Sequence, residues 1–284
     1  LFLSKAIAQI RRLKMNLLMD GLIHHYTSLT AFISICSSGK LWASESRYMN
    51  DAQEMRFFAE WFDHALEKLG SVGVEAEINR QLREWAKNRL LGQGHSVYVV
   101  SLSEEASLLS QWRAYTAVSQ GLSIGFDAHA LVAAAKRQGF RLGKCVYSKE
   151  DTFAVCKRVA TQLVKHALDR GAAEPSTAHP SQSYHPAFFE LEAELVQLAA
   201  LFKHFAFAEE KEWRLVSPIL PNYVEAPLKY RPGATSIIPY LEFDFEQEAA
   251  KRPNGGGAIA QVVVGPCVDS HRSMSSVRQV LSRS

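Results

Sequence analysis

The sequence has few cysteines, and the four that it has do not form a metal or disulfide motif. Cys36, Cys145, Cys156 and Cys267 are widely spaced and include no Cys-x-x-Cys pair. A zinc ribbon needs closely spaced cysteine pairs, and a disulfide-rich fold needs a higher density of cysteine. We therefore expect no metal ion and a reducing, cytoplasmic location.

The sequence also lacks a long uninterrupted hydrophobic run. Near its start, apolar residues such as Ile7 and Leu17 are interrupted by basic residues such as Lys5 and Arg11. A membrane span needs a longer apolar segment, and a signal peptide has its basic residues before the apolar core. We therefore interpret residues 1–21 as an amphipathic leader helix and expect no membrane partner.

Neither charge sign dominates the composition. The chain has 32 basic and 29 acidic residues, which gives a net charge of +3. The basic pairs Arg11-Arg12 and Lys136-Arg137 are isolated and do not extend into a stripe. Nucleic-acid binding normally requires such a stripe, so we expect no nucleic-acid partner.

Familiar catalytic motifs are missing or out of place. The sequence does not contain His-Glu-x-x-His, and its Gly-x-Ser-x-Gly match, Gly121-Leu122-Ser123-Ile124-Gly125, lies inside a predicted strand and not at the strand-to-helix turn of a nucleophile elbow. Gly121 and Gly125 have Gly-x-x-x-Gly spacing, but they lie inside a predicted strand and not at a turn from a strand to a helix. They therefore do not form a phosphate-binding loop.

Short strands and amphipathic helices follow one another from Leu22 onward. β-Branched and alternating patterns predict strands, and apolar residues at helical spacing predict helices. The predicted strands cover residues 22–26, 40–44, 97–101, 121–126, 141–147, 212–217, 235–245 and 258–265. The predicted helices cover residues 28–39, about 50–69, about 75–91, 129–138, 151–170 and 187–205. One more helix follows Ser103 and holds Leu109, Trp112 and Tyr115, and another closes the chain at the C-terminus.

These elements do not alternate regularly between strand and helix, which favours an α+β fold. We expect residues 22–284 to form a single domain with a central mixed, mainly antiparallel sheet flanked by helices. Residues 171–186 contain three prolines and no hydrophobic period. We interpret them as a flexible insertion into this domain.

The first candidate site residues lie at the end of the first predicted strand. His24 and His25 are adjacent, so their side chains point to opposite faces of the strand. We expect one of them to face a cleft, beside Tyr26, and the other to face solvent. A polar strand end followed by the helix cap Ser28 explains the pattern equally well.

A second group of candidate residues lies on the second predicted strand and at the start of the helix after it. Trp42 and Ser44 lie on this strand, and Asn50, Asp51 and Glu54 lie at the start of the next helix. Asp51 and Glu54 are about one helical turn apart and could share a ligand or a cation. Helix capping is the alternative interpretation of both carboxylates.

Aromatic residues on a later helix form a third group. Trp112 and Tyr115 are three residues apart and therefore share one face of the helix. They are candidates for ligand binding. Packing in the hydrophobic core is the more common role of such a pair.

The segment from Lys203 to Arg214 has the highest density of candidate residues. It contains His204, Glu210, Glu212 and Arg214, at the point where a predicted helix gives way to a strand. Glu210 and Glu212 have Glu-x-Glu spacing, so we expect both to face one side of the sheet. Carboxylates close to cations and aromatic rings often have shifted pKa values, as functional sites require.

Eight motifs occur in one order along the chain, and together they resemble the bacterial family known as domain-of-unknown-function family 2971. The resemblance extends from about Leu22 to the C-terminus, and the family name implies no activity. The motifs are His25-Tyr26-Thr27-Ser28, Leu41-Trp42-Ala43-Ser44, Asn50-Asp51-x-x-Glu54, Ser101-Leu102-Ser103, Trp112-x-x-Tyr115, Gly121-x-x-Ile124-Gly125-Phe126, Lys203-His204-x-x-Phe207-x-x-Glu210-x-Glu212-Trp213-Arg214 and Val264-Gly265-Pro266.

One hypothesis is an NAD-dependent ADP-ribosyltransferase-like enzyme of a bacterial defence or toxin system. By analogy with that superfamily, His25 would bind the NAD ribose, and Tyr26, Tyr48 or Trp42 would stack on nicotinamide. Glu212 would stabilise the oxocarbenium-like transition state, and Glu210 would activate a protein acceptor. The Ser-Thr-Ser strand of that superfamily is missing from the sequence.

Two other hypotheses use the same residues. The first is a non-catalytic module that senses a small nucleotide-like ligand or binds a protein partner. The second is a metal-dependent phosphodiesterase that uses Asp51, Glu54, His204, Glu210 and Glu212. It requires these carboxylates to converge on one ion. Under each hypothesis, we expect His25, Glu212 and Arg214 to line one cleft.

Overall fold

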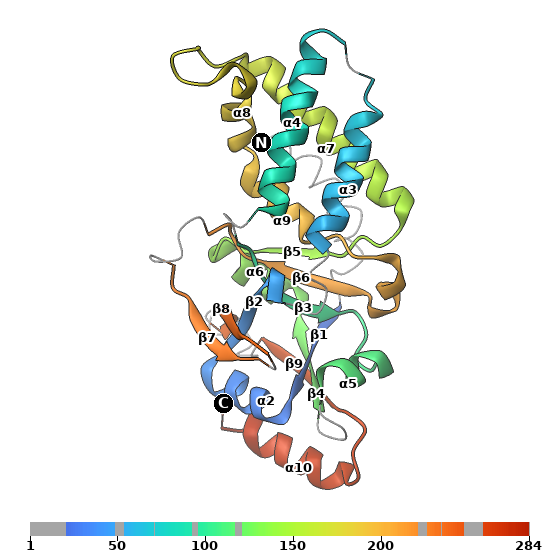
Figure 1. Ribbon diagram of the computed structural model, residues 1–284. Coiled ribbons are helices and arrows are strands. Elements are labelled where there is room, and N and C mark those ends of the chain that lie inside the picture. The colour runs from blue at the N-terminus through green and yellow to red at the C-terminus, as the bar shows by residue number, and fades with distance from the viewer. Residues whose placement is uncertain are drawn as a thin grey trace.

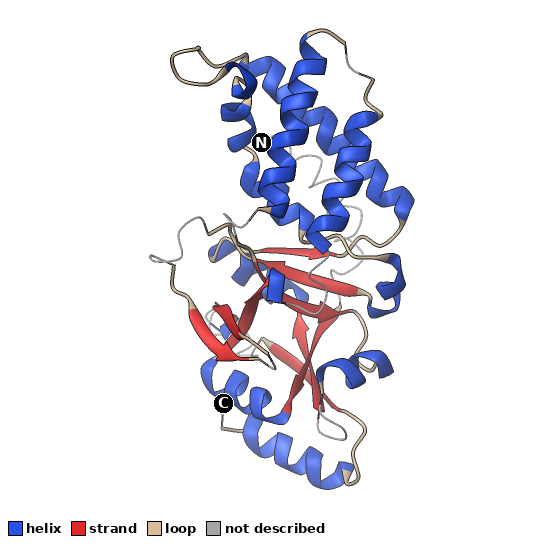
Figure 2. Cartoon of the chain, viewed as in Figure 1, coloured by secondary structure: helices blue, strands red, loops and turns tan. Residues whose placement is uncertain are grey.

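A branched β-sheet lies at the centre of the protein, as the computed structural model shows (Figures 1 and 2). The predicted leader helix lies outside the described residues. So do Asn50 and Asp51, and nothing is described for the side chain of Glu54. The structure describes residues 21–48, 54–70, 72–92, 96–116, 121–220, 226–233, 235–246 and 258–283.

Nine strands in the described part of the chain form this sheet, and every pair of named strands is antiparallel. A parallel bridge joins Val146 to Phe202. The predicted α+β class with a mainly antiparallel sheet is confirmed. The strands are β1 (Leu22–Ser28), β2 (Lys40–Glu45), β3 (Tyr98–Ser103), β4 (Gly121–Asp127), β5 (Arg141–Lys144), β6 (Glu212–Val216), β7 (Lys229–Pro232), β8 (Ile237–Asp244) and β9 (Ile259–Val264).

The sheet branches at β3, which has three partner strands. β6 pairs with β3 along its length, from Val99 to Ser103. The opposite edge of β3 is divided: β2 pairs with its beginning, where Ser44 is opposite Val99, and β1 pairs with its end, where His24 is opposite Ser103. β1 and β2 therefore diverge from a common strand, and a fork opens between them.

Helices cover the two faces of this branched sheet. Figure 1 shows α3, α4, α7, α8 and α9 gathered at one end of the molecule and α10 at the other. The helices are α2 (Leu29–Ser38), α3 (Glu54–Glu67), α4 (Val74–Leu91), α5 (Leu109–Tyr115), α6 (Ala128–Arg137), α7 (Lys149–Arg170), α8 (His185–Phe189), α9 (Glu192–Ala199) and α10 (Ser270–Leu281). Short 3-10 helices cover η1 (Ser46–Tyr48), η2 (Pro180–Gln182) and η3 (Phe205–Glu210).

The alternation of side chains along β3 creates two hydrophobic cores. Val99 belongs to the core that contains Phe58, Trp85 and Phe188 of the helical end. Its neighbours Tyr98 and Val100 belong to the second core, with residues of α2, α6 and β4. Successive strand residues point to opposite faces, so a strand that is apolar at most positions is buried on both sides.

Local sequence signals set the ends of α2 as predicted. The Ser28 hydroxyl accepts a hydrogen bond from the Ala31 backbone N–H at 3.2 Å and caps the N-terminus of the helix. Gly39 ends the helix in the left-handed conformation, with φ of 67°. The chain therefore turns at Gly39 directly into β2.

The structure differs from the sequence prediction in two elements. The predicted helix over residues 187–205 is two short helices, α8 and α9. The second ends before residue 205 because Leu201 and Lys203 form backbone hydrogen bonds with Val146 instead of continuing the helix. β7 was not predicted, because Lys229–Pro232 is short, polar and ends in proline.

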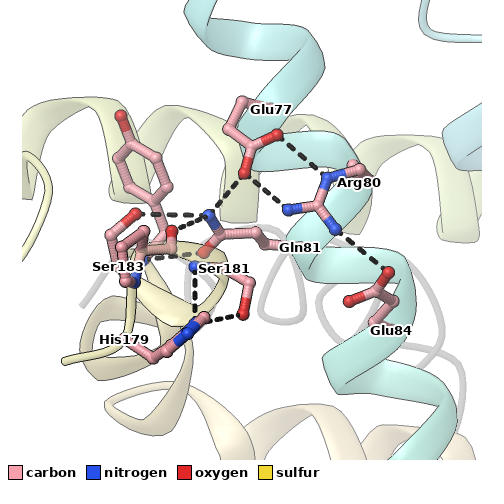
Figure 3. Close-up of polar contacts among 9 residues, drawn as sticks. Glu77, Arg80, Gln81, Glu84, His179, Ser181 and Ser183 are labelled. Carbon is pink, nitrogen blue, oxygen red and sulfur yellow. Dashed lines mark hydrogen bonds and ion pairs between the residues drawn. The ribbon is translucent and has the colours of Figure 1, made fainter.

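Residues 171–186 form the predicted loop, apart from η2 and the start of α8, and Gln81 of α4 anchors them (Figure 3). The fully buried Gln81 side chain donates to the Pro180 carbonyl and to the Ser183 hydroxyl, both at 3.2 Å. Its carbonyl oxygen accepts from the Tyr184 backbone N–H at 3.0 Å. The predicted flexibility of the loop stays a prediction.

We predict that Gln81→Leu lowers the free energy of unfolding by about 1–3 kcal/mol, because buried polar groups of the loop lose their partners. Urea denaturation measures this loss, and limited proteolysis should show faster cleavage within residues 171–186. Arg80→Gln is the control, since Arg80 forms exposed ion pairs with Glu77 and Glu84 that contribute little. An equal loss in both variants contradicts the anchoring role.

Candidate functional site

A pocket of about 440 Å³ opens in the fork between β1 and β2. Its floor is the part of β3 that neither strand covers: among the described strands, neither β1 nor β2 pairs with Val100 or Ser101. α2 and the β7–β8 hairpin complete the walls. The lining residues are His25, Thr27, Ala31, Ser34, Ile35, Trp42, Ser44, Tyr48, Val99, Val100, Ser101, Tyr115, Arg231, Gly233 and Ile238.

The backbone of the fork fixes the tautomer of His25. Nδ1 of His25 lies 3.0 Å from the Ser101 carbonyl oxygen, which can only accept a hydrogen bond. Nδ1 therefore carries the proton. Burial lowers the pKa of His25, although the bond to Ser101 opposes this shift, so the ring is neutral at pH 7. Nε2 of His25 is then a hydrogen-bond acceptor at the wall of the pocket.

Aromatic side chains supply a planar surface at the pocket. Trp42 stacks on Tyr240 with ring centroids 4.5 Å apart and an angle of 26° between the planes. Even so, 41% of Trp42 is exposed. Tyr48 and Tyr115 are also exposed lining residues. An aromatic ring that is held on one face and open elsewhere is suited to stacking on a planar ligand.

Arg231 supplies a positive charge at the pocket. Its Nη2 donates to the Ser44 hydroxyl at 3.0 Å, and this hydrogen bond joins β7 to β2. Among the residues that the structure describes, no carboxylate lines the pocket. Sequence reasoning missed Arg231, because β7 has no hydrophobic pattern that would place it beside Ser44.

The structure brings several predicted site residues together in the pocket and places the others elsewhere. His25, Trp42, Ser44, Tyr48 and Tyr115 line the pocket, whereas Tyr26 and Trp112 do not. The Tyr26 hydroxyl donates to the Glu105 carbonyl at 2.7 Å and accepts from the Leu108 N–H at 2.8 Å. Its ring meets Trp112 edge to face, with centroids 4.7 Å apart. This pair packs in the fold and holds the loop that leads into α5.

The expectation that one of the adjacent histidines faces solvent is wrong. His24 is only 4% exposed, and its ring packs over Gly125 of β4. A Cβ atom at Gly125 would lie 2.9 Å from Cε1 of His24. The His24 ring can pack here because glycine has no side chain. Burial lowers the pKa of His24, and the charge of Glu105 opposes this shift.

Glu212 belongs to a buried ion cluster with Lys203, Glu210 and Arg214. Nζ of Lys203 lies 2.6 Å from Oε2 of Glu210 and 3.0 Å from Oε2 of Glu212. Nε and Nη2 of Arg214 donate to the two carboxylate oxygens of Glu212, at 2.9 and 3.1 Å. Nη1 of Arg214 donates to the carbonyl of Ala200 at 2.7 Å, just after the end of α9.

Attraction within this cluster keeps Glu212 ionised. Burial alone would raise the pKa of the carboxyl group, but Arg214 and Lys203 outweigh it and lower the pKa from 4.5 to about 2. Burial likewise opposes the charge of Lys203, yet Glu212 and Glu210 raise its pKa. Arg214 therefore pairs with a carboxylate inside the fold.

The expected single cleft of His25, Glu212 and Arg214 is not what the structure shows. Glu212 and Arg214 are buried and do not line the pocket. Ser101 lies between the two places: its carbonyl accepts a hydrogen bond from His25, and it lies opposite Arg214 in the pairing of β3 with β6. The ion cluster therefore adjoins the pocket through one residue.

Glu210 and His204 also differ from expectation. Glu210 ends η3 and is not part of β6, because Lys211 adopts a left-handed conformation with φ of 45° before the strand begins. Both carboxylates nevertheless reach Lys203. His204 is exposed, and its Nδ1 accepts from the Ala206 N–H at 3.3 Å at the start of η3.

The described residues contain neither a metal-binding group of side chains nor a membrane-spanning helix. No three or more His, Cys, Asp or Glu side chains in this part of the chain are grouped so as to hold a metal ion. The residues of the phosphodiesterase hypothesis also include Asp51 and Glu54. Asp51 and the side chain of Glu54 lie outside the part of the chain that the structure describes. No described helix combines the length and the apolar character that crossing a membrane requires.

We predict that Glu212→Gln lowers the free energy of unfolding by about 3–5 kcal/mol at pH 7, because it leaves buried cations without their counter-charge. The pKa of Glu212 is lower in the folded state. Its contribution is therefore complete above about pH 5 and is lost as the pH falls toward 2.

Urea denaturation at several pH values tests this prediction. Wild type should lose stability more steeply than Glu212→Gln between pH 5 and pH 2. Glu190→Gln, which removes an exposed carboxylate that pairs with Arg170, is the control and should differ little from wild type. Identical pH profiles for wild type and Glu212→Gln would show that the cluster does not stabilise the fold.

The comparisons with known proteins give a family and no activity. No curated protein and no solved structure matches the chain significantly. Residues 111–215 match the model of the family described as "Protein of unknown function (DUF2971)". This segment contains the complete ion cluster and Tyr115, whereas His25 and Trp42 precede it. The match supports the assignment of the chain to this family of unknown function.

Proposed function

We propose that the pocket between β1 and β2 binds a small nucleotide-like ligand. The observation that carries this proposal is the combination, in one pocket, of a half-exposed, stacked Trp42 and a neutral His25. The volume of about 440 Å³ lies within the range of small-molecule sites, which is about 300–1,000 Å³. A nucleotide supplies a planar ring and a hydroxylated sugar, which these two side chains complement.

In this arrangement, each side chain recognises one part of the ligand. The base stacks on Trp42, with Tyr48 or Tyr115 as neighbouring aromatic surfaces. A ribose hydroxyl donates to Nε2 of His25, which the Ser101 carbonyl keeps in the accepting tautomer. Because the ring is already neutral and oriented, it loses little entropy on binding.

We predict that Trp42→Ala weakens binding of ADP-ribose by about tenfold or more, because stacking of one base contributes about 1–3 kcal/mol. Isothermal titration calorimetry measures the dissociation constant. Tyr230→Ala is the control: Tyr230 is an exposed aromatic residue on β7 that does not line the pocket. Failure of wild type to bind either ADP-ribose or NAD would reject the proposal.

NAD-dependent ADP-ribosyl transfer is a second candidate function. It is favoured by Ser101, which lines the pocket and lies opposite Arg214, the hydrogen-bond partner of Glu212, in the pairing of β3 with β6. In this reaction the bond between ribose C1′ and the nicotinamide nitrogen breaks, and its electron pair remains on nicotinamide. The nucleophile of the acceptor forms a bond to C1′ and loses its proton to water. The Glu212 carboxylate would stabilise the positive charge that develops on the ribose.

Nicotinamide release from labelled NAD, in the presence of cell extract, separates the two functions. For a transferase, wild type releases nicotinamide and Glu212→Gln does not, whereas both retain NAD binding. Circular dichroism must first show that Glu212→Gln is folded, because the substitution is destabilising. Binding of NAD without release by wild type identifies a sensing module instead.

A further inference from the structure

Arg231 differs from two neighbouring cations, Lys229 and Lys40, in what it contacts. Lys229, two residues earlier on β7, lies 2.6 Å from Oε1 of Glu242. Lys40 on β2 lies 2.8 Å from Oε2 of the same carboxylate. Arg231 instead donates to the neutral hydroxyl of Ser44, and no carboxylate of the described residues pairs with it.

This contact leaves most of the hydrogen-bonding capacity of Arg231 available. A guanidinium has five N–H donors, and the Ser44 hydroxyl accepts from one nitrogen. Arg231 is partly buried, and its positive charge is not balanced by a carboxylate among the described lining residues. A partly desolvated cation of this kind is stabilised by an anionic ligand.

Ser44 holds this guanidinium at the pocket. It lies on β2 two residues after Trp42, so both side chains point to the same face of the strand. The hydrogen bond from Arg231 to Ser44 therefore places the positive charge on the strand that also carries the stacking residue. One ligand can contact the indole and the guanidinium together if it joins a planar ring to an anion.

We propose that Arg231 is the anion-recognising residue of the pocket and that it selects ligands carrying a phosphate. This inference rests on the proposed binding of a nucleotide-like ligand and narrows its chemical class. The planar guanidinium can bind two phosphate oxygens at once, which a lysine cannot do. Ser44 is the positioning residue that orients Arg231.

Calorimetric titration with ADP-ribose and with adenosine tests the proposal. Wild type should bind ADP-ribose at least about tenfold more tightly than adenosine. Arg231→Gln should reduce the affinity for ADP-ribose by about tenfold or more and change that for adenosine less than about twofold. Arg231→Lys should restore part of the affinity, because it restores the charge without the bidentate geometry.

Lys229→Gln is the matched control, because it removes the same charge from the same strand outside the pocket. It should bind both ligands as wild type does. Unchanged binding of ADP-ribose by Arg231→Gln, or an equal loss for both ligands, would overturn the role of Arg231 while leaving the nucleotide pocket intact. If wild type binds neither ligand, the proposed function and this inference are both rejected.

Discussion

The division of one edge of β3 between two strands determines the geometry of the site. β2 pairs with the start of β3 and β1 with its end, so the backbone at Ser101 is left for other partners. The carbonyl of Ser101 bonds His25, and the divergence of β1 from β2 leaves the pocket. On the opposite edge, uninterrupted pairing with β6 brings Arg214 opposite Ser101. One strand therefore supports the pocket on one edge and the ion cluster on the other.

The ion cluster links the helical end of the molecule to this strand. Arg214 on β6 donates to the carbonyl of Ala200 after α9, and Lys203, in the connection that follows, contacts Glu212 at the start of the strand. Burying such charges is costly unless each one is paired and hydrogen-bonded. Here both oxygens of Glu212 have cationic partners. The cluster therefore fixes the path by which the chain returns from α9 to the sheet. Apolar contacts alone would define this path less precisely.

Local patterns in the sequence predict much of the fold, and they predict about half of the residues that form the candidate site. The Ser28 cap, the Gly39 turn and the strand at β3 follow from local patterns, and the structure confirms them. His25, Trp42, Ser44 and Tyr115 were identified from their motifs, whereas their convergence depends on the branch at β3. Arg231 could not be found, because its role comes from a contact with Ser44 across 187 residues of sequence. The pairing of Glu212 also depends on long-range register, which residue spacing does not reveal.

The placement of Glu212 limits how a transferase could use it. Glu212 is only 3% exposed, and its carboxylate already accepts from Lys203 and Arg214. A ligand in the pocket therefore meets Ser101, which lines it, before it meets Glu212. Catalysis by Glu212 would require the ligand to reach past Ser101 or the cluster to rearrange. Ligand binding makes no such demand, because His25, Trp42 and Arg231 already line the pocket. The geometry therefore supports binding in the present arrangement, and chemistry at Glu212 only after a further conformational step.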